Sequence, residues 1–224
     1  MDRRARAREL AEEYLNRGDP KGWFEHLYRE AEEGNATVPW ADCRPNPGLL
    51  AFWERQTISS VGKTALTIGC GFGDDAEQLA AWGFQTTAFD VSESAIRSCR
   101  QRFPDSKVDY TTADLLRPPD DWIGLFDFVL EAYTLQVLPT YLREQAMQCI
   151  SSLVRNGGQL LVIARGRDEQ DPISQMPWPV TRCELDTVKH FGFEEISFED
   201  YFDLESPPVR RFRGVYKKVS LGCL

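Results

Sequence analysis

ALTIGCGFGDD, residues 65–75, is the stretch that decides the fold of this chain. Its first four residues are apolar or β-branched and predict a short buried strand, and residues 74–82 predict a helix. Gly69, Gly71 and Gly73 stand between the strand and the helix. Because glycine has no side chain, the backbone can turn sharply there and approach a ligand closely. An ordinary tight turn without a ligand is the plain alternative.

The alternation of strand and helix continues outward along the chain. Repeated strand–helix units imply a parallel α/β sheet covered by helices on both faces, with right-handed crossovers. Ligands of such sheets bind beyond the carboxyl ends of the strands, where the winding direction switches. The further strands are expected at residues 86–89, 108–111, 126–130, 159–164, 194–198 and 212–219, and the further helices at residues 92–102, 141–154 and 184–191.

The residues before this alternation have a different pattern. Two amphipathic helices are expected in the first 35 residues, separated by a glycine–proline break. A proline-rich segment, residues 36–48, and a short helix follow them. We therefore expect one domain over residues 1–224, in which a helical arm of residues 1–58 packs on an α/β core of residues 59–224.

Composition and charge narrow the classes of partner. At 224 residues the chain fits one domain with a full core, and 42% hydrophobic with 27% charged residues is typical of globular proteins. The formal charge of −9 disfavours a nucleic-acid partner, since an acidic body repels phosphate backbones. No apolar run approaches the roughly 18 residues of a membrane helix, and no secretory leader pattern follows the first arginines. We expect a soluble, cytoplasmic monomer or homodimer without a membrane partner.

The cysteines and histidines predict no metal site. Six cysteines are scattered without a C-x-x-C pair, which is typical of reduced, structural thiols. The two histidines, His26 and His190, have no zinc-ligand spacing. Both are expected to be structural, His26 on an apolar helix face and His190 at a helix end.

Acidic residues follow the next two expected strands. Asp90 ends the second strand, twenty-one residues after Gly69. A carboxylate there can accept hydrogen bonds from both ribose hydroxyls of an adenosine ligand. Asp114 follows the third strand, where the acid or its neighbouring backbone can face an adenine amino group, with Leu115 against the ring. A loop acid or a helix cap is an equal alternative for Asp114.

The acids after the glycine turn distinguish between adenosine ligands. The nicotinamide-dinucleotide pattern G-x-G-x-x-G requires a third glycine at position 74, which is Asp74, and Asp75 follows. Two carboxylates at a helix start repel the pyrophosphate that a helix N-terminus otherwise attracts. S-adenosylmethionine (SAM) has no phosphate and carries an ammonium and a sulfonium, which acids suit, although Asp is also favourable in any first helical turn. The sequence therefore favours SAM over the cofactor of a nicotinamide oxidoreductase.

The fourth strand and the loops beyond it supply the candidates for the acceptor side. Asp127 lies at the start of that strand and is expected to be structural, whereas Glu131 lies at its ligand end. There Glu131 can face the methionine ammonium of SAM or the acceptor. Glu131 and Tyr133 are the candidate catalytic residues, with no firm assignment. Arg165 and Arg167 follow the fifth strand and can bind an acidic group of the acceptor, although solvated charges are the preferred interpretation.

Together these motifs resemble the class I SAM-dependent methyltransferases over roughly residues 60–220. The glycine turn, the two strand-end acids and the strand FDFVLE stand in the order and spacing of that family, and RRFRGVYKK resembles its last strand. The resemblance implies a Rossmann-like, doubly wound, seven-stranded and mostly parallel sheet with SAM as cofactor. The residues that would bind SAM are Gly69, Cys70, Gly71, Gly73, Asp75, Asp90, Val91, Asp114, Leu115 and Glu131.

The sequence departs from the family at Thr67, where many relatives have an acid that helps to hold the methionine end. Because of this departure, other groups, such as Asp75 or Glu131, would have to hold the methionine end. A narrower resemblance is to the thiopurine, thiol-halide and tellurite-resistance methyltransferases, carried by GCG-x-G-x-D and by a Pro-Trp pair followed by spaced prolines. In that branch the N-terminal arm is a lid over the cofactor. Trp23 and Trp40 would then line the SAM pocket; core anchors for the N-terminal helices are an equal alternative.

The expected function is methyl transfer from SAM to a small-molecule acceptor. The sulfonium already activates the methyl group, so the protein has to align the reacting atoms and exclude water. A sulfur acceptor is favoured because it needs little help from a base, and the chain offers no obvious catalytic histidine. Oxygen or nitrogen methylation of a small metabolite and a non-catalytic SAM-binding protein remain alternatives.

Overall fold

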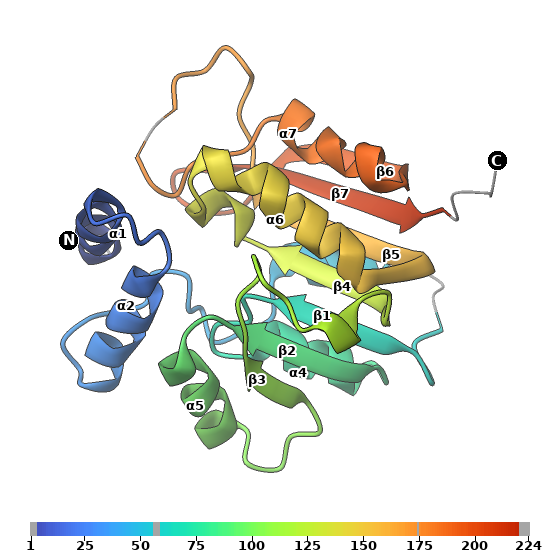
Figure 1. Ribbon diagram of the computed structural model, residues 1–224, viewed down its shortest axis with the longest axis horizontal. Coiled ribbons are helices and arrows are strands. Elements are labelled where there is room, and N and C mark those ends of the chain that lie inside the picture. Colours follow the sequence, from blue (N-terminus) through green and yellow to red (C-terminus); the bar gives the residue numbers. More distant parts are fainter. Residues whose placement is uncertain (1–3, 56–58, 174, 220–224) are drawn as a thin grey trace.

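The centre of the computed structural model, which describes residues 4–55, 59–173 and 175–219, is a seven-stranded sheet (Figure 1). Its strand order is β3-β2-β1-β4-β5-β7-β6. The first five strands of this order pair in parallel, and β7 runs antiparallel to both of its neighbours. The strands are β1 Thr64–Ile68, β2 Gln85–Asp90, β3 Asp109–Thr112, β4 Phe126–Ala132, β5 Val154–Arg165, β6 Phe193–Phe202 and β7 Arg210–Lys218.

The chain winds in both directions from β1, which confirms the expected doubly wound, mostly parallel sheet. Strands β2 and β3 lie to one side of β1, and β4 and β5 lie to the other. The winding therefore reverses between β1 and β4, and ligands of such sheets bind at the carboxyl ends of the strands beside that reversal. The glycine turn, residues 69–73, follows β1 directly and so lies at this point.

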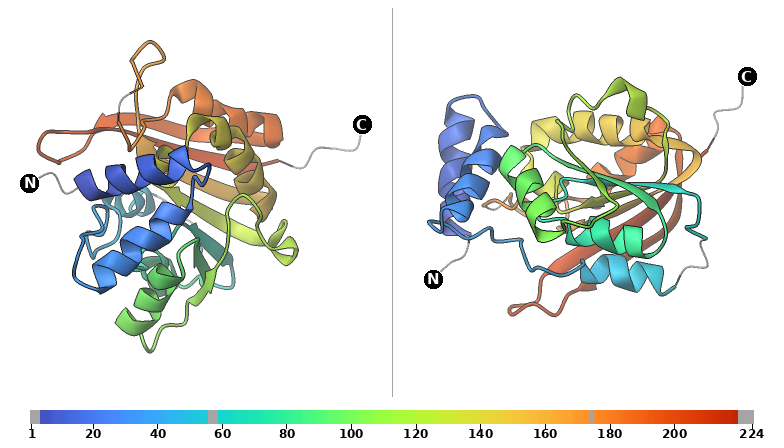
Figure 2. Two further views of the ribbon diagram at one scale, coloured as in Figure 1. Left: turned by 60° about the vertical axis from the view of Figure 1, so that its left-hand side comes forward. Right: turned by 90° about the horizontal axis from the view of Figure 1, so that it is seen from below.

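Helices cover both faces of the sheet. In Figure 2, right, α6 and α7 lie on one face, and α3, α4 and α5 lie on the other. Short 3-10 turns η1, η2 and η3 complete the connections. The helices are α1 Ala5–Asn16, α2 Gly22–Glu32, α3 Pro47–Trp53, α4 Asp74–Ala81, α5 Glu93–Arg102, α6 Thr140–Leu153 and α7 Arg182–Asp186, and the 3-10 turns are η1 Asp120–Trp122, η2 Leu135–Val137 and η3 Thr187–Phe191.

The core lies between the sheet and these two helical layers. Side chains of successive strand residues point to opposite faces, so Leu66 packs toward α6 while Ala65 packs toward α3 and α4. The run Leu160 to Ala164 in β5 is fully buried. A strand covered on both faces has no polar face, which explains why these central strands are continuous apolar runs in the sequence.

Helices α1 and α2 stand apart from these layers, at one end of the sheet (Figures 1 and 2). Leu10 and Trp23 share a buried cluster with Val137 and Met176, which lie in the loops after β4 and β5. Since both loops leave the carboxyl ends of their strands, the two helices cover the edge where a ligand is expected. Among the described residues, no helix combines the length and the apolar character needed to cross a membrane.

The expected helix over residues 184–191 is divided in the structure. A capping box between Thr181 and Glu184 starts α7 two residues earlier than expected, and the 3-10 turn η3 follows it. Gly192, with φ +83°, ends the segment as the sequence predicts. Strand β5 is longer than expected because it begins directly after α6 at Val154.

Candidate functional site

The glycine turn has the conformation for which its residues are suited. Gly69, Gly71 and Gly73 have φ values of +56°, +55° and +88°, in the left-handed region that favours glycine. A Cβ atom on Gly73 would lie 2.5 Å from the hydroxyl oxygen of Tyr110. The turn is therefore both left-handed and tightly surrounded, which fixes the path of the backbone between β1 and α4.

Asp90 lies directly beside this turn, as its position at the end of β2 predicts. Its carboxylate accepts hydrogen bonds from the backbone N–H groups of Gly71 and Ser92, each at 3.0 Å. The residue is only 5% exposed, and burial raises the pKa of its carboxyl group to about 6. Val91 lies between Asp90 and Ser92 in the loop after β2. Asp90 thus holds the glycine turn and the start of α5 in register.

The two acids that begin α4 point to different partners. The carboxylate of Asp75 accepts a hydrogen bond of 2.6 Å from the backbone N–H of Asn46, and burial raises its pKa to about 6. Asp74 forms a salt bridge of 2.8 Å with Arg102 of α5. Of the two acids, Asp75 therefore joins α4 to the proline-rich segment, whereas Asp74 joins α4 to α5.

Asp114 is engaged by the N-terminal helices. Its carboxylate pairs with the ammonium of Lys21 and accepts a 2.9 Å hydrogen bond from the backbone N–H of Leu116. Leu115, which we expect beside an adenine ring, is buried against the core between β1 and α6. The ion pair with Lys21 could not be predicted from local sequence patterns, because the two residues are 93 positions apart.

Aromatic side chains from α2 and the following loop lie against the glycine turn. The indole N–H of Trp40 donates a 2.8 Å hydrogen bond to the hydroxyl oxygen of Tyr28. A Cβ atom on Gly71 would lie 3.1 Å from that hydroxyl and 3.9 Å from the Trp40 ring. Trp23 lies one layer further out, edge-on to Trp40 with ring centroids 6.0 Å apart.

Trp40 therefore touches the expected cofactor turn, whereas Trp23 belongs to the buried cluster behind it. The sequence reasoning missed Tyr28. Its signal was the helical spacing of Trp23, Leu27 and Tyr28, which is the pattern of a buried helix face and does not distinguish a ligand contact from a core contact.

Glu25 is a second residue that the sequence reasoning missed. Its carboxylate accepts hydrogen bonds from the hydroxyl of Ser92 at 2.7 Å and from the backbone and hydroxyl of Ser94 at 3.1 and 2.8 Å. These donors lie at the N-terminus of α5, where a negative charge is favoured by the free N–H groups and the helix dipole. Glu25 thereby attaches α2 to the loop that carries Asp90.

Glu131 is completely buried at the carboxyl end of β4. One carboxylate oxygen accepts the backbone N–H groups of Thr134 and Leu135, at 2.7 and 2.9 Å. The other oxygen is buried and has no hydrogen-bond partner among the residues that the structure describes. Burial raises the pKa of this carboxyl group to about 7. Glu131 thus shapes the loop after β4, whose Thr134 hydroxyl would lie 2.5 Å from a Cβ on Gly69.

Two further candidates lie at the same edge. Tyr133 follows β4 with φ +69°, a left-handed conformation that is uncommon for a residue with a side chain. Its backbone N–H donates to the carbonyl of Ile163 in β5. Cys70 lies in the turn itself, where a hydrogen bond with Cys99 and burial raise the pKa of its thiol. A thiol with a raised pKa is a weak nucleophile, so Cys70 fits a structural position.

The interpretation of Arg165 and Arg167 as solvated charges is wrong. Their side chains are only 17% and 13% exposed. The guanidinium of Arg167 donates to the backbone carbonyls of Pro179 and Asp168 and so closes the loop after β5. The guanidinium of Arg165 faces Glu205 at 3.7 Å. The sequence could not predict this burial, because Arg167 is enclosed by the fold of its own loop, and Arg165 faces Glu205, forty residues further along the chain.

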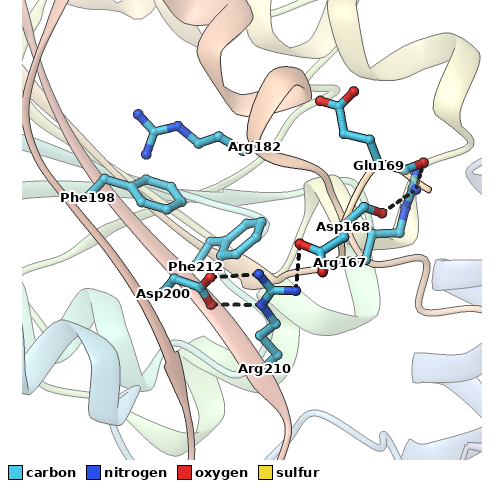
Figure 3. A pocket seen from close by; sticks show the side chains of 8 residues that line it. All are labelled: Arg167, Asp168, Glu169, Arg182, Phe198, Asp200, Arg210 and Phe212. Atoms are coloured by element: carbon cyan, nitrogen blue, oxygen red, sulfur yellow. Dashed lines mark hydrogen bonds and ion pairs between the residues drawn. The ribbon is translucent and has the colours of Figure 1, made fainter. Parts of the chain in front are cut away.

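A shallow pocket of about 220 Å³ lies elsewhere, between the loop after β5, α7 and the β6–β7 edge (Figure 3). Arg182 stacks over Phe198, with its guanidinium carbon 3.6 Å from the ring centroid. Arg210 pairs with Asp200 and Asp168 across the opening. None of the cofactor-site candidates lines this pocket. Within the described ranges, no three His, Cys, Asp or Glu side chains gather as metal ligands would.

Comparison with known protein families places the same residues in one domain. A family model described as "Methyltransferase domain" matches residues 65–158, from β1 into β5. The match contains the glycine turn, Asp90, Asp114 and Glu131. Residues 65–158 are therefore similar to a methyltransferase domain, and the part of the candidate site contributed by the core lies inside this matched segment.

Curated relatives include methyltransferases of more than one acceptor class. The ubiquinone biosynthesis O-methyltransferase of Aromatoleum aromaticum is 34% identical over 117 residues, which cover 51% of this chain and 49% of that protein. The thiopurine S-methyltransferase of Vibrio atlanticus is 22% identical over 184 residues, which cover 74% of this chain and 82% of that protein. The chain thus spans about half the length of the ubiquinone-type relatives that it matches.

Solved structures confirm the fold. A chain from work on the conversion of a disulfide bond into a thioacetal group during echinomycin biosynthesis superposes with a TM-score of 0.71 at 17% identity, covering 88% of this chain and 94% of that one. A SAM-dependent methyltransferase from Methanosarcina mazei gives a TM-score of 0.65 at 16% identity, covering 79% and 99%. The 1,6-didemethyltoxoflavin-N1-methyltransferase of Burkholderia thailandensis, solved with S-adenosylhomocysteine, gives 0.67 at 16% identity, covering 88% and 86%. The chain has the Rossmann-like fold of SAM-dependent methyltransferases.

Proposed function

We propose that this protein transfers the methyl group of SAM to a small-molecule acceptor. One observation carries the proposal: the left-handed glycine turn and the buried carboxyl groups of Asp75, Asp90 and Glu131 lie together at the switch point of the sheet, within the methyltransferase domain. Burial alone disfavours charged carboxylates, so three of them at one edge fit a ligand with positive charge. The Glu131 oxygen that has no hydrogen-bond partner among the described residues leaves an acceptor for the ammonium of such a ligand.

The residues at the carboxyl ends of the strands bind different parts of the cofactor. Asp90 faces the ribose hydroxyls, Leu115 packs against the adenine, and Gly69 to Gly73 let the backbone approach the ligand. Glu131 and Asp75 bind the methionine ammonium, because the acid that many relatives have for this purpose is Thr67 in this chain. When bound, SAM supplies a methyl group that its sulfonium already activates, and the protein supplies alignment and exclusion of water.

Residues 1–58 act as a lid on the core of residues 59–224. Trp40 and Tyr28 lie against the glycine turn, and Glu25 and Lys21 attach their helix to the loops after β2 and β3. A lid held by these polar contacts and by the apolar cluster of Leu10, Trp23, Val137 and Met176 can open for exchange of the cofactor and close to exclude water from the reacting atoms.

The acceptor is a small molecule, and a sulfur nucleophile is our first candidate. Glu131 and Tyr133, at the carboxyl end of β4, are the titratable groups that would lie beside the acceptor, and burial raises the pKa of both. A tyrosine with a raised pKa stays protonated near neutral pH and is a poor base, and Glu131 is assigned above to the methionine ammonium, so an acceptor that ionises by itself is favoured. Oxygen methylation is the second candidate, supported by the higher identity of the ubiquinone-type relatives.

Two measurements test this function. Mass spectrometry of ligand released from the purified protein, with calorimetry of SAM against NAD, is expected to show SAM or its product and no binding of NAD. A panel of thiols, phenols and amines, assayed for S-adenosylhomocysteine, then identifies the acceptor. Turnover restricted to phenols would overturn the sulfur preference. SAM that binds but is never consumed would identify a non-catalytic binding protein.

A further inference from the structure

Two buried arginines lie side by side at the carboxyl end of β5. Arg165 ends β5, and its direct cross-strand partner is Arg211 in β7. Residues directly opposite in an antiparallel pair project from the same face of the sheet, so the two guanidinium groups share one small space. The side chain of Arg211 is 4% exposed, and that of Arg165 is 17% exposed.

This arrangement is unfavourable for two reasons: the charged groups lose solvation, and like charges repel one another. Burial, together with the nearby charges of Arg4 and Arg211, lowers the pKa of Arg165. Like charges directly opposite one another destabilise a strand pair. One terminal nitrogen of Arg211, Nη1, is buried without a hydrogen-bond partner among the described residues. A guanidinium left with an unused donor in a buried space is suited to an anion that is not part of the core.

The carboxylates that now face the pair differ in how firmly they are held. Asp203 bonds Arg211 at 2.7 Å and is itself fixed by the backbone N–H groups of Glu205 and Val209. Glu205 reaches Arg211 at 2.5 Å and Arg165 at 3.7 Å from the loop between β6 and β7. Its side chain is 43% exposed, so it can leave the pair without breaking the core.

The pair lies within reach of the expected reaction site. The guanidinium carbon of Arg211 lies 4.6 Å from the ring centroid of Tyr133, the residue that follows β4. Arg165 and Arg211 lie one and two strands beyond β4 in the sheet. At about 4.8 Å per strand, the pair is about 5 to 10 Å from the end of β4. That distance suits a small acceptor whose charged end lies a few bonds from the methylated atom.

We infer that Arg165 and Arg211 bind a carboxylate of the methyl acceptor, and that Glu205 occupies this subsite until the acceptor displaces it. The inference rests on the proposed methyl transfer and adds the chemical class of the acceptor. A carboxylate is favoured over a phosphate because two carboxylates already match the guanidinium geometry here. Arg167, the other arginine of this loop, takes no part because backbone carbonyls occupy its guanidinium.

Matched acceptors test the subsite. Pairs such as 3-mercaptopropanoate and its amide, or 3,4-dihydroxybenzoate and its amide, differ only in the charged group. For the pair that is turned over, we expect kcat/KM to favour the acid by about 10-fold or more, since a hydrogen-bonded charge contributes that much. Arg211→Lys keeps the charge but loses the planar fork, and is expected to reduce the preference at least about 5-fold. Glu205→Gln is expected to lower KM for the acid and to leave the amide unchanged.

Arg155→Lys is the matched control, because Arg155 pairs with Asp127 at the opposite end of the strands, where β4 and β5 begin. Thermal unfolding of each variant separates a loss of fold from a loss of preference, and Glu205 is exposed enough to be replaced without that risk. Equal kcat/KM for acid and amide, or a KM for the acid that rises in Glu205→Gln, would overturn the subsite while leaving methyl transfer intact.

Calorimetry of the same acids and amides, with S-adenosylhomocysteine present, measures their affinity for the subsite without turnover. Binding of the acid in preference to the amide supports the inference, and equal binding refutes it. Absence of any binding of SAM or S-adenosylhomocysteine would instead refute the proposed function.

Discussion

Gly73 shows how a single residue sets the geometry of the candidate cofactor site. Its φ of +88° and the 2.5 Å approach of the Tyr110 hydroxyl to the place of a Cβ act together. We predict that Gly73→Ala lowers the free energy of unfolding by about 3 kcal/mol, from the left-handed conformation and from overpacking. SAM affinity is expected to fall as well, because the turn has to move. Urea denaturation and calorimetry measure the two effects.

Gly62→Ala is the control for this substitution. Gly62 has a similar φ of +77°, but no atom lies within 4 Å of the place of its Cβ. Its replacement is expected to cost only about 1 kcal/mol and to leave SAM binding unchanged. Equal losses of stability in the two variants would show that the surroundings of Gly73 have no part in the effect.

Single residues also mark how far the sequence could predict the site. The glycine turn and Asp90 were predicted because strand ends and turn chemistry are local signals, and the structure brings them together. The partners of Asp75, and the roles of Glu25 and Arg211, were not predicted. Each depends on a contact between distant positions, and a local pattern carries no information about which distant residue arrives. The burial of Arg165 was misjudged for the same reason.

At the scale of elements, α2 is attached to α5 through one carboxylate. Glu25 accepts three hydrogen bonds from Ser92 and Ser94. We predict that Glu25→Ala lowers the free energy of unfolding by about 1 to 2 kcal/mol, as the loss of a helix cap does. Amide hydrogen exchange in α2 is expected to speed up more than exchange in β1 or β4, because α2 loses an attachment while the sheet keeps its core.

The pH dependence of this effect has a definite sign. Although burial raises the pKa of Glu25, the hydrogen bonds from Ser92 and Ser94 lower it below the ordinary value of 4.5. A depressed pKa contributes stability above the unfolded value, which is lost as the pH falls through the folded value. The stability difference between Glu25→Ala and the unaltered protein should therefore shrink below about pH 4. Glu12→Ala, on the exposed face of α1, is the control for the loss of a glutamate that caps no helix.

Elements were predicted better than their arrangement. Every strand expected from the sequence is present, since apolar runs and glycine punctuation are strong local signals. The order β3-β2-β1-β4-β5-β7-β6 and the antiparallel direction of β7 depend on pairing between distant segments. The resemblance to a family supplied a doubly wound, seven-stranded and mostly parallel sheet, but not this order or the direction of β7.

At the scale of the whole molecule, the chain is acidic, with a formal charge of −9, and yet buries carboxyl groups at one edge of its sheet. Burial raises the pKa of Asp75 and Asp90 to about 6 and that of Glu131 to about 7. A folded pKa above the unfolded value means that these groups cost stability as the pH rises from about 4 to 7. A cation bound beside them offsets that cost by favouring their ionised forms.

Binding of SAM should therefore release protons between pH 5 and 7. SAM carries a sulfonium and an ammonium against one carboxylate, so its net charge lowers the pKa of the three buried carboxyl groups. At pH 6 we predict release of about one proton or more, with an affinity that rises about tenfold per pH unit and levels off above about pH 7.5. Calorimetry at pH 6 in two buffers of different ionisation enthalpy measures the released protons directly. Asp75→Asn should reduce that number, whereas an observed enthalpy that is the same in both buffers would show that these carboxyl groups do not face the cofactor's charge.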